Sequence, residues 1–215
     1  MAGPSGITAT SCARKVPRGE RRRIELIDVA EQTFLERGFA DTTMQVIAER
    51  AGASKETLYR HFASKELLFA EIVRRKASEV SGPDAAVARG GSPERVLTEL
   101  GIGLLRIILT GQTSCLFRTV VSEAVRSPEL GDLFYQQGPG RTLERLTAYL
   151  KSVSQRGELQ CDDPLTAARL FLGAVVAQFH LRGLVQSDWQ PPTENEIKRH
   201  VKAAVTMFLA RYGSR

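Results

Sequence analysis

Cysteine and histidine are scarce in this sequence, which limits the metal and redox chemistry it can carry. Its 215 residues include 3 cysteines and 3 histidines. Cys12, Cys115 and Cys161 are odd in number, lie far apart and form no C-x-x-C pair of the kind that indicates a zinc site or a redox dithiol. We interpret them as free thiols, either buried or in a tail. The histidines have no metal-ligand spacing, so we expect neither a metal site nor a cofactor.

Long hydrophobic runs are also missing. The apolar stretch from Ile102 to Leu109 is interrupted by Gly103 and Arg106, and it is far shorter than the roughly 18 residues that span a bilayer. Near the N-terminus, basic residues are not followed by the apolar segment of a secretory signal peptide. We therefore expect a cytoplasmic protein with no membrane partner.

The sequence lacks the short motifs of common enzyme classes. It contains no P-loop, no H-E-x-x-H and no G-x-S-x-G, and Gly101-x-Gly103 follows no predicted strand, so it does not indicate a dinucleotide loop. No catalytic residues are predicted. An enzyme remains the rival interpretation, and turnover of a substrate would be its distinguishing sign.

Positive charge is in excess and is concentrated near the N-terminus. The formal net charge is +6 and the isoelectric point is near 9.5. This balance alone would fit nucleic acid, a membrane surface or simple solubility. Six basic residues lie between Arg14 and Arg23 against one acidic residue, Glu20, directly before the first predicted helix. That position favours an arm that contacts DNA.

Hydrophobic periodicity predicts an all-α protein, with no alternating strand pattern and no internal repeat. We expect a mobile basic tail over residues 1–19, a helix-turn-helix domain of three helices plus a connecting fourth over 20–80, and a larger helical bundle for ligand binding and dimerisation over 81–215. In the first part, helices are expected over about 20–38, 43–52, 54–62 and 65–80. In the second, they are expected over about 93–111, 114–125, 127–137, 140–154, 164–184 and 193–212, the last opened by a capping box of Thr193 and Glu196.

The segment from Thr43 to Phe62, TMQVIAERAGASKETLYRHF, meets the physical requirements of a helix-turn-helix. A short helix precedes a turn at Gly52, which tolerates positive φ, and Ser54 can cap a second helix whose first turn is free to enter a major groove. An ordinary pair of bundle helices would fit the same pattern.

The surrounding residues add a family resemblance. From Ile24 to Val73 the chain closely resembles the DNA-binding domain of TetR/AcrR-type regulators, through AEQTFLERGF, the Ala51-Gly52 step, TLYRHF and the Lys65-Glu66 step. The resemblance implies a helical bundle that dimerises through its last two helices and says little about the ligand. Glu56 departs from the pattern, because many members carry glycine there, and this puts close backbone approach to a base in doubt.

The resemblance also implies which residues contact DNA. Thr43 and Ser54 would bond phosphates at the starts of their helices, with Tyr59, His61 and Lys65 adding phosphate contacts. The best candidates for base edges are Lys55 and Thr57, because N-terminal residues of a recognition helix reach deepest. Arg60 is a further outward-facing candidate. His61 packed on the turn and Lys65 as a solvated surface lysine are alternatives.

The second half offers weaker signals. As candidate pocket residues we name Phe117, Val121, Phe134 and Phe171, although core packing would equally explain each of them. Apolar stripes on the last two helices predict an isologous dimer contact. The dimer candidates are Phe171, Ala174, Val175, Val201, Val205 and Phe208.

These observations predict a sequence-specific DNA-binding transcriptional regulator. We expect it to be a repressor whose partners are double-stranded operator DNA, a small-molecule effector that releases it, and a second copy of the chain. The alternative is an architectural DNA-binding protein that ignores ligands, whose binding would be sensitive to salt and indifferent to sequence.

Overall fold

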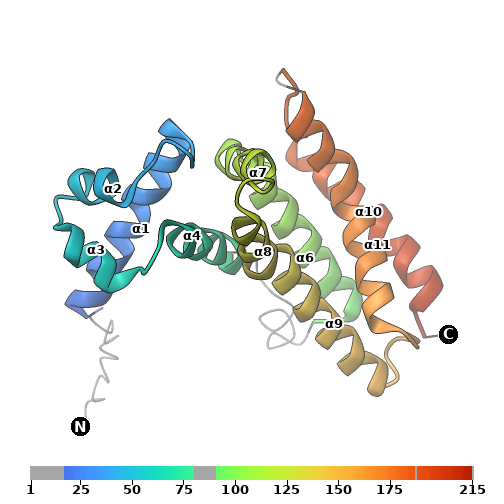
Figure 1. The fold of residues 1–215 in the computed structure, drawn as a ribbon. Helices are drawn as coiled ribbons and strands as arrows, with labels where there is room; N and C mark the ends of the chain where they lie inside the picture. The colour runs from blue at the N-terminus through green and yellow to red at the C-terminus, as the bar shows by residue number, and fades with distance from the viewer. Residues whose placement is uncertain (1–16, 80–90, 187, 215) are drawn as a thin grey trace, which may run out of the picture.

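The computed structural model describes residues 17–79, 91–186 and 188–214, and these form two groups of helices joined by α4 (Figure 1). The N-terminal helices are α1 (Arg18–Arg37), α2 (Met44–Arg50), α3 (Lys55–His61) and α4 (Lys65–Glu79). The remaining helices are α6 (Pro93–Ile108), α7 (Gly111–Glu123), α8 (Pro128–Gln137), α9 (Pro139–Gln155), α10 (Pro164–Val185) and α11 (Glu194–Tyr212).

The all-α fold predicted from periodicity is confirmed, and so are the side-chain caps that begin several helices. Thr43 and Ser54 accept hydrogen bonds from the backbone N–H groups of Val46 and Thr57, and Thr193 with Glu196 forms the predicted capping box. The differences lie at helix ends. α7 begins three residues early because Thr110 caps it, and α1 begins at Arg18, so the last residues of the predicted tail are helical. The rest of that tail and the predicted domain boundary near residue 80 lie outside the described residues.

One hydrophobic cluster holds the N-terminal helices together and extends into the second half. Its centre is a triangle of Phe34, Phe39 and Phe69, whose ring centroids lie 5.4 to 5.6 Å apart. The same cluster includes three buried side chains from α7 and α8: Leu116, Val120 and Leu130. The N-terminal unit therefore shares its core with the larger bundle, which periodicity did not predict.

A second cluster lies among α6, α9, α10 and α11 and accounts for most of the residues expected at a dimer interface. Phe171 and Phe208 stack edge-to-face at a centroid distance of 5.4 Å. Both rings are at most 4% exposed, and Val175, Val201 and Val205 are buried beside them. These five side chains are covered within one protomer, so their burial needs no second copy. Of the predicted dimer set, Ala174 alone is half-buried.

α10 is the one helix, among the residues described, that is long and apolar enough to cross a membrane, and the bent pair α6–α7 passes the same test when taken together. The sequence analysis found no such run because Arg169 and Arg182 interrupt α10. Core helices of globular proteins pass this test too, and α10 contributes Ala167, Ala168, Phe171 and Val175 to the core. Length and composition therefore give only weak evidence for a membrane span.

An ion-pair group ties α1 to α4 within the N-terminal unit. The Glu71 carboxylate accepts from Arg74 Nε and from Arg23 Nη1, each at 2.8 Å, and its side chain is 13% exposed. Hydrogen bonding by Arg74, reinforced by Arg23, lowers the pKa of Glu71 from 4.5 to about 2. A carboxyl group whose pKa is lower in the folded state stabilises the fold above pH 4.5, and this contribution is lost as the pH falls toward 2.

Replacement of Glu71 by glutamine is expected to lower the free energy of unfolding by about 1 kcal/mol at pH 7, after allowance for solvent screening of the pair. The difference from wild type should shrink as the pH falls to 3. Urea unfolding at the two pH values measures it. Glu25→Gln, which removes the exposed pair with Arg22, is the control and should change the free energy by less than about 0.5 kcal/mol. Equal losses in the two variants would contradict the assignment.

Candidate DNA interface and effector cavity

The turn between α2 and α3 is fixed by its own backbone and by α1. Gly52 has φ +57°, a left-handed conformation that favours glycine. Arg22, on α1, donates to the carbonyl oxygens of Ala51 and Gly52 at 2.9 and 3.2 Å. The basic run of the sequence thus contributes Arg22 to internal structure, and Arg23 does the same through Glu71 and the ring of Phe62. These contacts set the position of α3 on the rest of the unit.

Most of the predicted DNA contacts lie together on the exposed side of α2 and α3. Thr43, Ser54, Lys55, Tyr59 and Arg60 are exposed, while Thr57 and His61 are half-buried. The Ser54 hydroxyl accepts from the backbone of Thr57 at 3.1 Å and lies 2.9 Å from its hydroxyl oxygen. The Lys55 ammonium lies 5.8 Å from the centroid of the Tyr59 ring. Hydroxyls, an exposed phenol and two cations thus lie at the start of α2 and around α3.

Lys65 is placed differently from the other candidates. Its ammonium donates to the carbonyl oxygen of Phe39 at 2.7 Å and lies 4.1 Å from the centroid of the Phe39 ring. The side chain is half-buried and joins the start of α4 to the segment that follows α1. The sequence suggested either a phosphate contact or a solvated surface lysine. The contact with Phe39 is a structural role that neither interpretation predicted.

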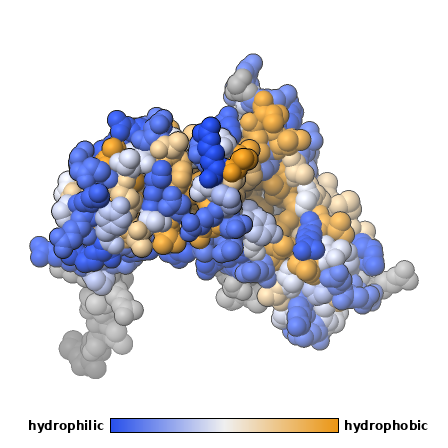
Figure 2. Space-filling model, in the orientation of Figure 1, coloured by the Kyte–Doolittle hydropathy of each residue, from blue (hydrophilic) through white to orange (hydrophobic). Residues whose placement is uncertain are grey.

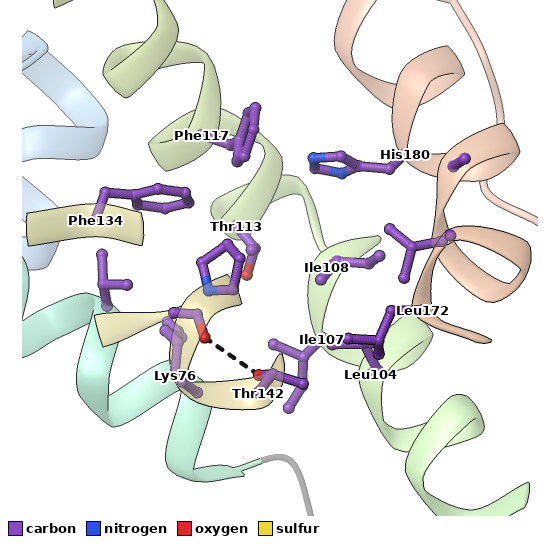
Figure 3. A pocket seen from close by; sticks show the side chains of 17 residues that line it. Lys76, Leu104, Ile107, Ile108, Thr113, Phe117, Phe134, Thr142, Leu172 and His180 are labelled. Atoms are coloured by element: carbon purple, nitrogen blue, oxygen red, sulfur yellow. Dashed lines mark hydrogen bonds between the residues drawn. The ribbon is translucent and has the colours of Figure 1, made fainter. Parts of the chain in front are cut away.

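A cavity with an almost entirely apolar wall, named the main cavity for its position between α4 and the helices of the second half, has a volume of 410 Å³ (Figure 3). Two of the four predicted pocket residues, Phe117 and Phe134, line it. The other two do not: Val121 is 60% exposed on α7, and Phe171 is buried against Phe208. The remaining wall residues are Val73, Lys76, Ala77, Leu104, Ile107, Ile108, Thr113, Gly138, Pro139, Thr142, Leu172, Gly173, Val176, Ala177 and His180.

Aromatic rings gather at one side of the cavity. Phe117 contacts Phe134 and His180 edge-to-face, at centroid distances of 5.1 and 4.5 Å. Burial lowers the pKa of His180 below its ordinary value of 6.5, so the imidazole is neutral at pH 7. His180 was not among the predicted pocket residues, although Leu172, Val176 and His180 recur four residues apart along α10, a spacing that could have indicated a shared face.

Hydroxyl groups are few in this wall. Thr142 donates to the carbonyl oxygen of Gly138 at 3.2 Å, the bond drawn in Figure 3. Thr113 lines the cavity and donates its backbone N–H to the Thr110 hydroxyl at 3.2 Å. An apolar space with a small number of polar groups is typical of a site for a small organic molecule.

A smaller polar cavity of 240 Å³ lies between α1, α4 and α7. Across it, Arg75 pairs with Asp28 at 2.6 Å and with Glu31 at 3.2 Å, and the Lys76 ammonium pairs with Glu31 at 2.8 Å. Glu31 is buried, with 8% of its side chain exposed. Lys76 belongs to the walls of both cavities.

Apolar side chains are exposed along one side of α10 and on α11. Leu170, Leu181 and Val185 are 58%, 60% and 70% exposed, and Met207 on α11 is 61% exposed. Figure 2 shows hydrophobic surface gathered over the part of the molecule where α10 lies. Among the described residues, no group of three histidine, cysteine or acidic side chains could hold a metal ion.

Two family models match this chain. Residues 26–72 match the model of bacterial regulatory proteins of the TetR family, and residues 95–214 match that of the C-terminal domain of AefR-like transcriptional repressors. Among curated relatives, the repressor KstR2 of Rhodococcus jostii is 38% identical over 78 residues, which are 36% of this chain and 38% of KstR2. The chain thus matches well under half the length of that relative.

Solved structures match almost the whole chain. A protein from Mesorhizobium loti assigned to the TetR family of regulators is 31% identical, with a TM-score of 0.77 over 92% of this chain and 99% of that one. The flavonoid-responsive regulator FrrA is also 31% identical, with a TM-score of 0.71 over 91% and 99%. With its helix-turn-helix, its larger helical domain and matches to both family models, the chain belongs to the TetR family of transcriptional regulators.

Proposed function

We propose that this chain is a cytoplasmic repressor that binds operator DNA as a homodimer and is released when a small molecule occupies the 410 Å³ cavity. The observation that carries the proposal is the position of α4. Val73 belongs to the hydrophobic cluster of the DNA-binding unit and also lines the cavity. A molecule that displaces this wall therefore displaces part of the core that supports α2 and α3.

The exposed residues of α2 and α3 support DNA binding. Thr43 and Ser54 lie at helix starts, where free N–H groups favour a phosphate. Lys55 and Thr57, in the first turn of α3, are proposed to contact base edges, and Tyr59, Arg60 and His61 to contact the backbone. Lys65 keeps two donors beyond its bond to Phe39 and is proposed to contact a phosphate in addition to its internal role.

The exposed apolar side chains of α10 and α11 support a dimer. Leu170, Leu181 and Met207 would be covered by the same side chains of a second copy related by a two-fold axis. TetR-family regulators usually act as dimers. The proposed interface is therefore formed by these exposed side chains in place of the predicted ones that are buried within the protomer. Ala174, which is half-buried, remains a candidate beside them.

The release experiment begins with sites selected from random DNA. Fluorescence anisotropy of the best site then measures the effect of a library of apolar small molecules on the affinity. We expect some compounds to weaken binding, and we expect Val176→Trp, which fills the cavity, to abolish their effect. If the compounds release the wild type and Val176→Trp equally, the cavity is not the effector site. Compounds that bind in the cavity without changing DNA affinity would favour an architectural protein.

Lys55→Ala and Thr57→Ala are expected to change which sequence is preferred, because a good contact to a base edge discriminates by roughly 1 to 3 kcal/mol. Lys65→Ala should weaken binding to all sequences alike. It should also lower the free energy of unfolding without DNA by about 1 to 2 kcal/mol, since the Phe39 carbonyl loses its partner. Salt titrations on selected and scrambled DNA, with urea unfolding, separate these effects. An unchanged ratio of selected to scrambled affinity in the Lys55 and Thr57 variants would mean that α3 is not the recognition helix.

Leu181→Glu is expected to shift the protein from dimer to monomer and to weaken operator binding, because a single half-site loses the avidity of two. Val121→Glu is a matched control, since Val121 is also 60% exposed but lies on α7. Analytical ultracentrifugation at micromolar concentration measures the assembly. A wild-type monomer, or the same behaviour in the two variants, would exclude this interface.

A further inference from the structure

The charges in the wall of the main cavity restrict its occupant. Among the residues that the structure describes, no aspartate or glutamate lines the cavity, so a cationic molecule would find no counter-charge in this wall. The titratable residues in the described part of the wall are His180 and Lys76. His180 is neutral at pH 7 because burial lowers its pKa, which leaves Lys76 as the charged group of the wall. The cavity therefore suits neutral or acidic molecules.

Lys76 connects this cavity to the DNA-binding unit. It is an element of the apolar wall, yet its ammonium lies 2.8 Å from Glu31 Oε1 and 3.4 Å from Gln112 Oε1 in the smaller polar cavity. Its side chain is 18% exposed. A lysine ammonium carries three donors on a flexible four-carbon stem, so it can turn toward a new acceptor without movement of the helix. In Figure 3, Lys76 lies across the cavity from Phe117 and His180.

We propose that the effector is an aromatic or other apolar molecule carrying one acidic group, and that this acid takes the Lys76 ammonium away from Glu31. This inference rests on the proposed function of the cavity. The apolar part of the molecule lies against Phe117, Phe134 and the aliphatic wall, and the acidic group points toward α4.

The exchange weakens the contact between α1 and α4. Glu31 lies on α1 and has two cationic partners, Lys76 at 2.8 Å and Arg75 at 3.2 Å, and Arg75 also pairs with Asp28. When Lys76 leaves, a buried carboxylate keeps only the longer of its two pairs. A buried charge that loses a partner is strongly destabilised. The acid therefore binds best when α1 moves relative to α4, and α1 also holds the helix-turn-helix through Arg22.

The test uses three probes that share a phenylalkyl chain and carry an anionic, a neutral or a cationic polar group: 6-phenylhexanoate, 6-phenylhexanol and 6-phenylhexylammonium. Calorimetry on the full-length protein at pH 7 should show that the carboxylate binds about tenfold more tightly than the alcohol, as expected for a charge-assisted hydrogen bond, with no measurable binding of the ammonium. Lys76→Met should reduce the affinity for the carboxylate to that for the alcohol and leave the alcohol unchanged. Lys151→Met, at an exposed lysine outside this cavity, should match wild type.

Glu31→Gln supplies the second half of the test. It frees Lys76, so the carboxylate should bind about tenfold more tightly than to wild type, yet it should no longer release operator DNA more effectively than the alcohol does. Thermal unfolding and unchanged alcohol binding verify that the variant is folded.

The results separate the two proposals. Equal binding of carboxylate and alcohol, a preference for the acid that survives in Lys76→Met, or failure of all three probes to bind at millimolar concentration would overturn the ligand class. Unaltered release in Glu31→Gln would overturn the exchange. If the carboxylate binds through Lys76 but leaves operator affinity unchanged in wild type, the ligand class holds and the proposed release mechanism fails.

Discussion

Helix α4 is packed on two sides, and the rest of the structure depends on this constraint. Leu68, Phe69 and Ile72 are fully buried in the cluster that α4 forms with α1, α2 and α3. The C-terminal part of the same helix contributes Val73, Lys76 and Ala77 to the wall of the main cavity. The residues that line the cavity and the residues that pack against α1, α2 and α3 thus belong to one continuous helix. In the proposed mechanism, a shift of the cavity wall would be carried along this helix to the helices with the predicted DNA contacts.

Two ion-pair groups fix α1 to neighbouring turns of α4, and they differ in the freedom of their cations. Glu71 is held by Arg23 and Arg74, whose guanidinium groups form hydrogen bonds in a fixed fork geometry. Glu31 is held by Arg75 and by the more flexible Lys76. Replacing a buried pair by apolar groups is often neutral, but removing one partner is costly. The contact around Glu31 is thus the one whose strength depends on what else Lys76 can bind.

Local features of the fold were predictable from the sequence, and long-range contacts were not. Ser54 and Thr193 were identified as caps because a cap involves residues only three apart. Lys65 and Phe39 lie 26 residues apart, and no pattern links a lysine to a distant carbonyl group. The stripe containing Val201 and Phe208 was correctly predicted to be buried, but periodicity reports that a face is covered without reporting what covers it. Two of the four predicted cavity residues, Phe117 and Phe134, line the main cavity. Lys76 and His180 were missed because a basic residue near the end of α4 and a lone histidine on the apolar α10 carry no spacing that points to a shared site.

α10 explains why the interface and the cavity were hard to separate by pattern. One side of the helix packs Phe171 and Val175 into the core, the next lines the cavity with Leu172, Val176 and His180, and a third exposes Leu170 and Leu181. A helix that is apolar on every side has no amphipathic direction from which a single buried face could be read. The same fact has a mechanical consequence. Because a helix moves as a rigid rod, an occupant that pushes on the cavity side also moves the surface proposed to contact the second copy. In the proposed dimer, occupancy would therefore act on the spacing of the two recognition helices by two routes, through α4 within each protomer and through α10 between them.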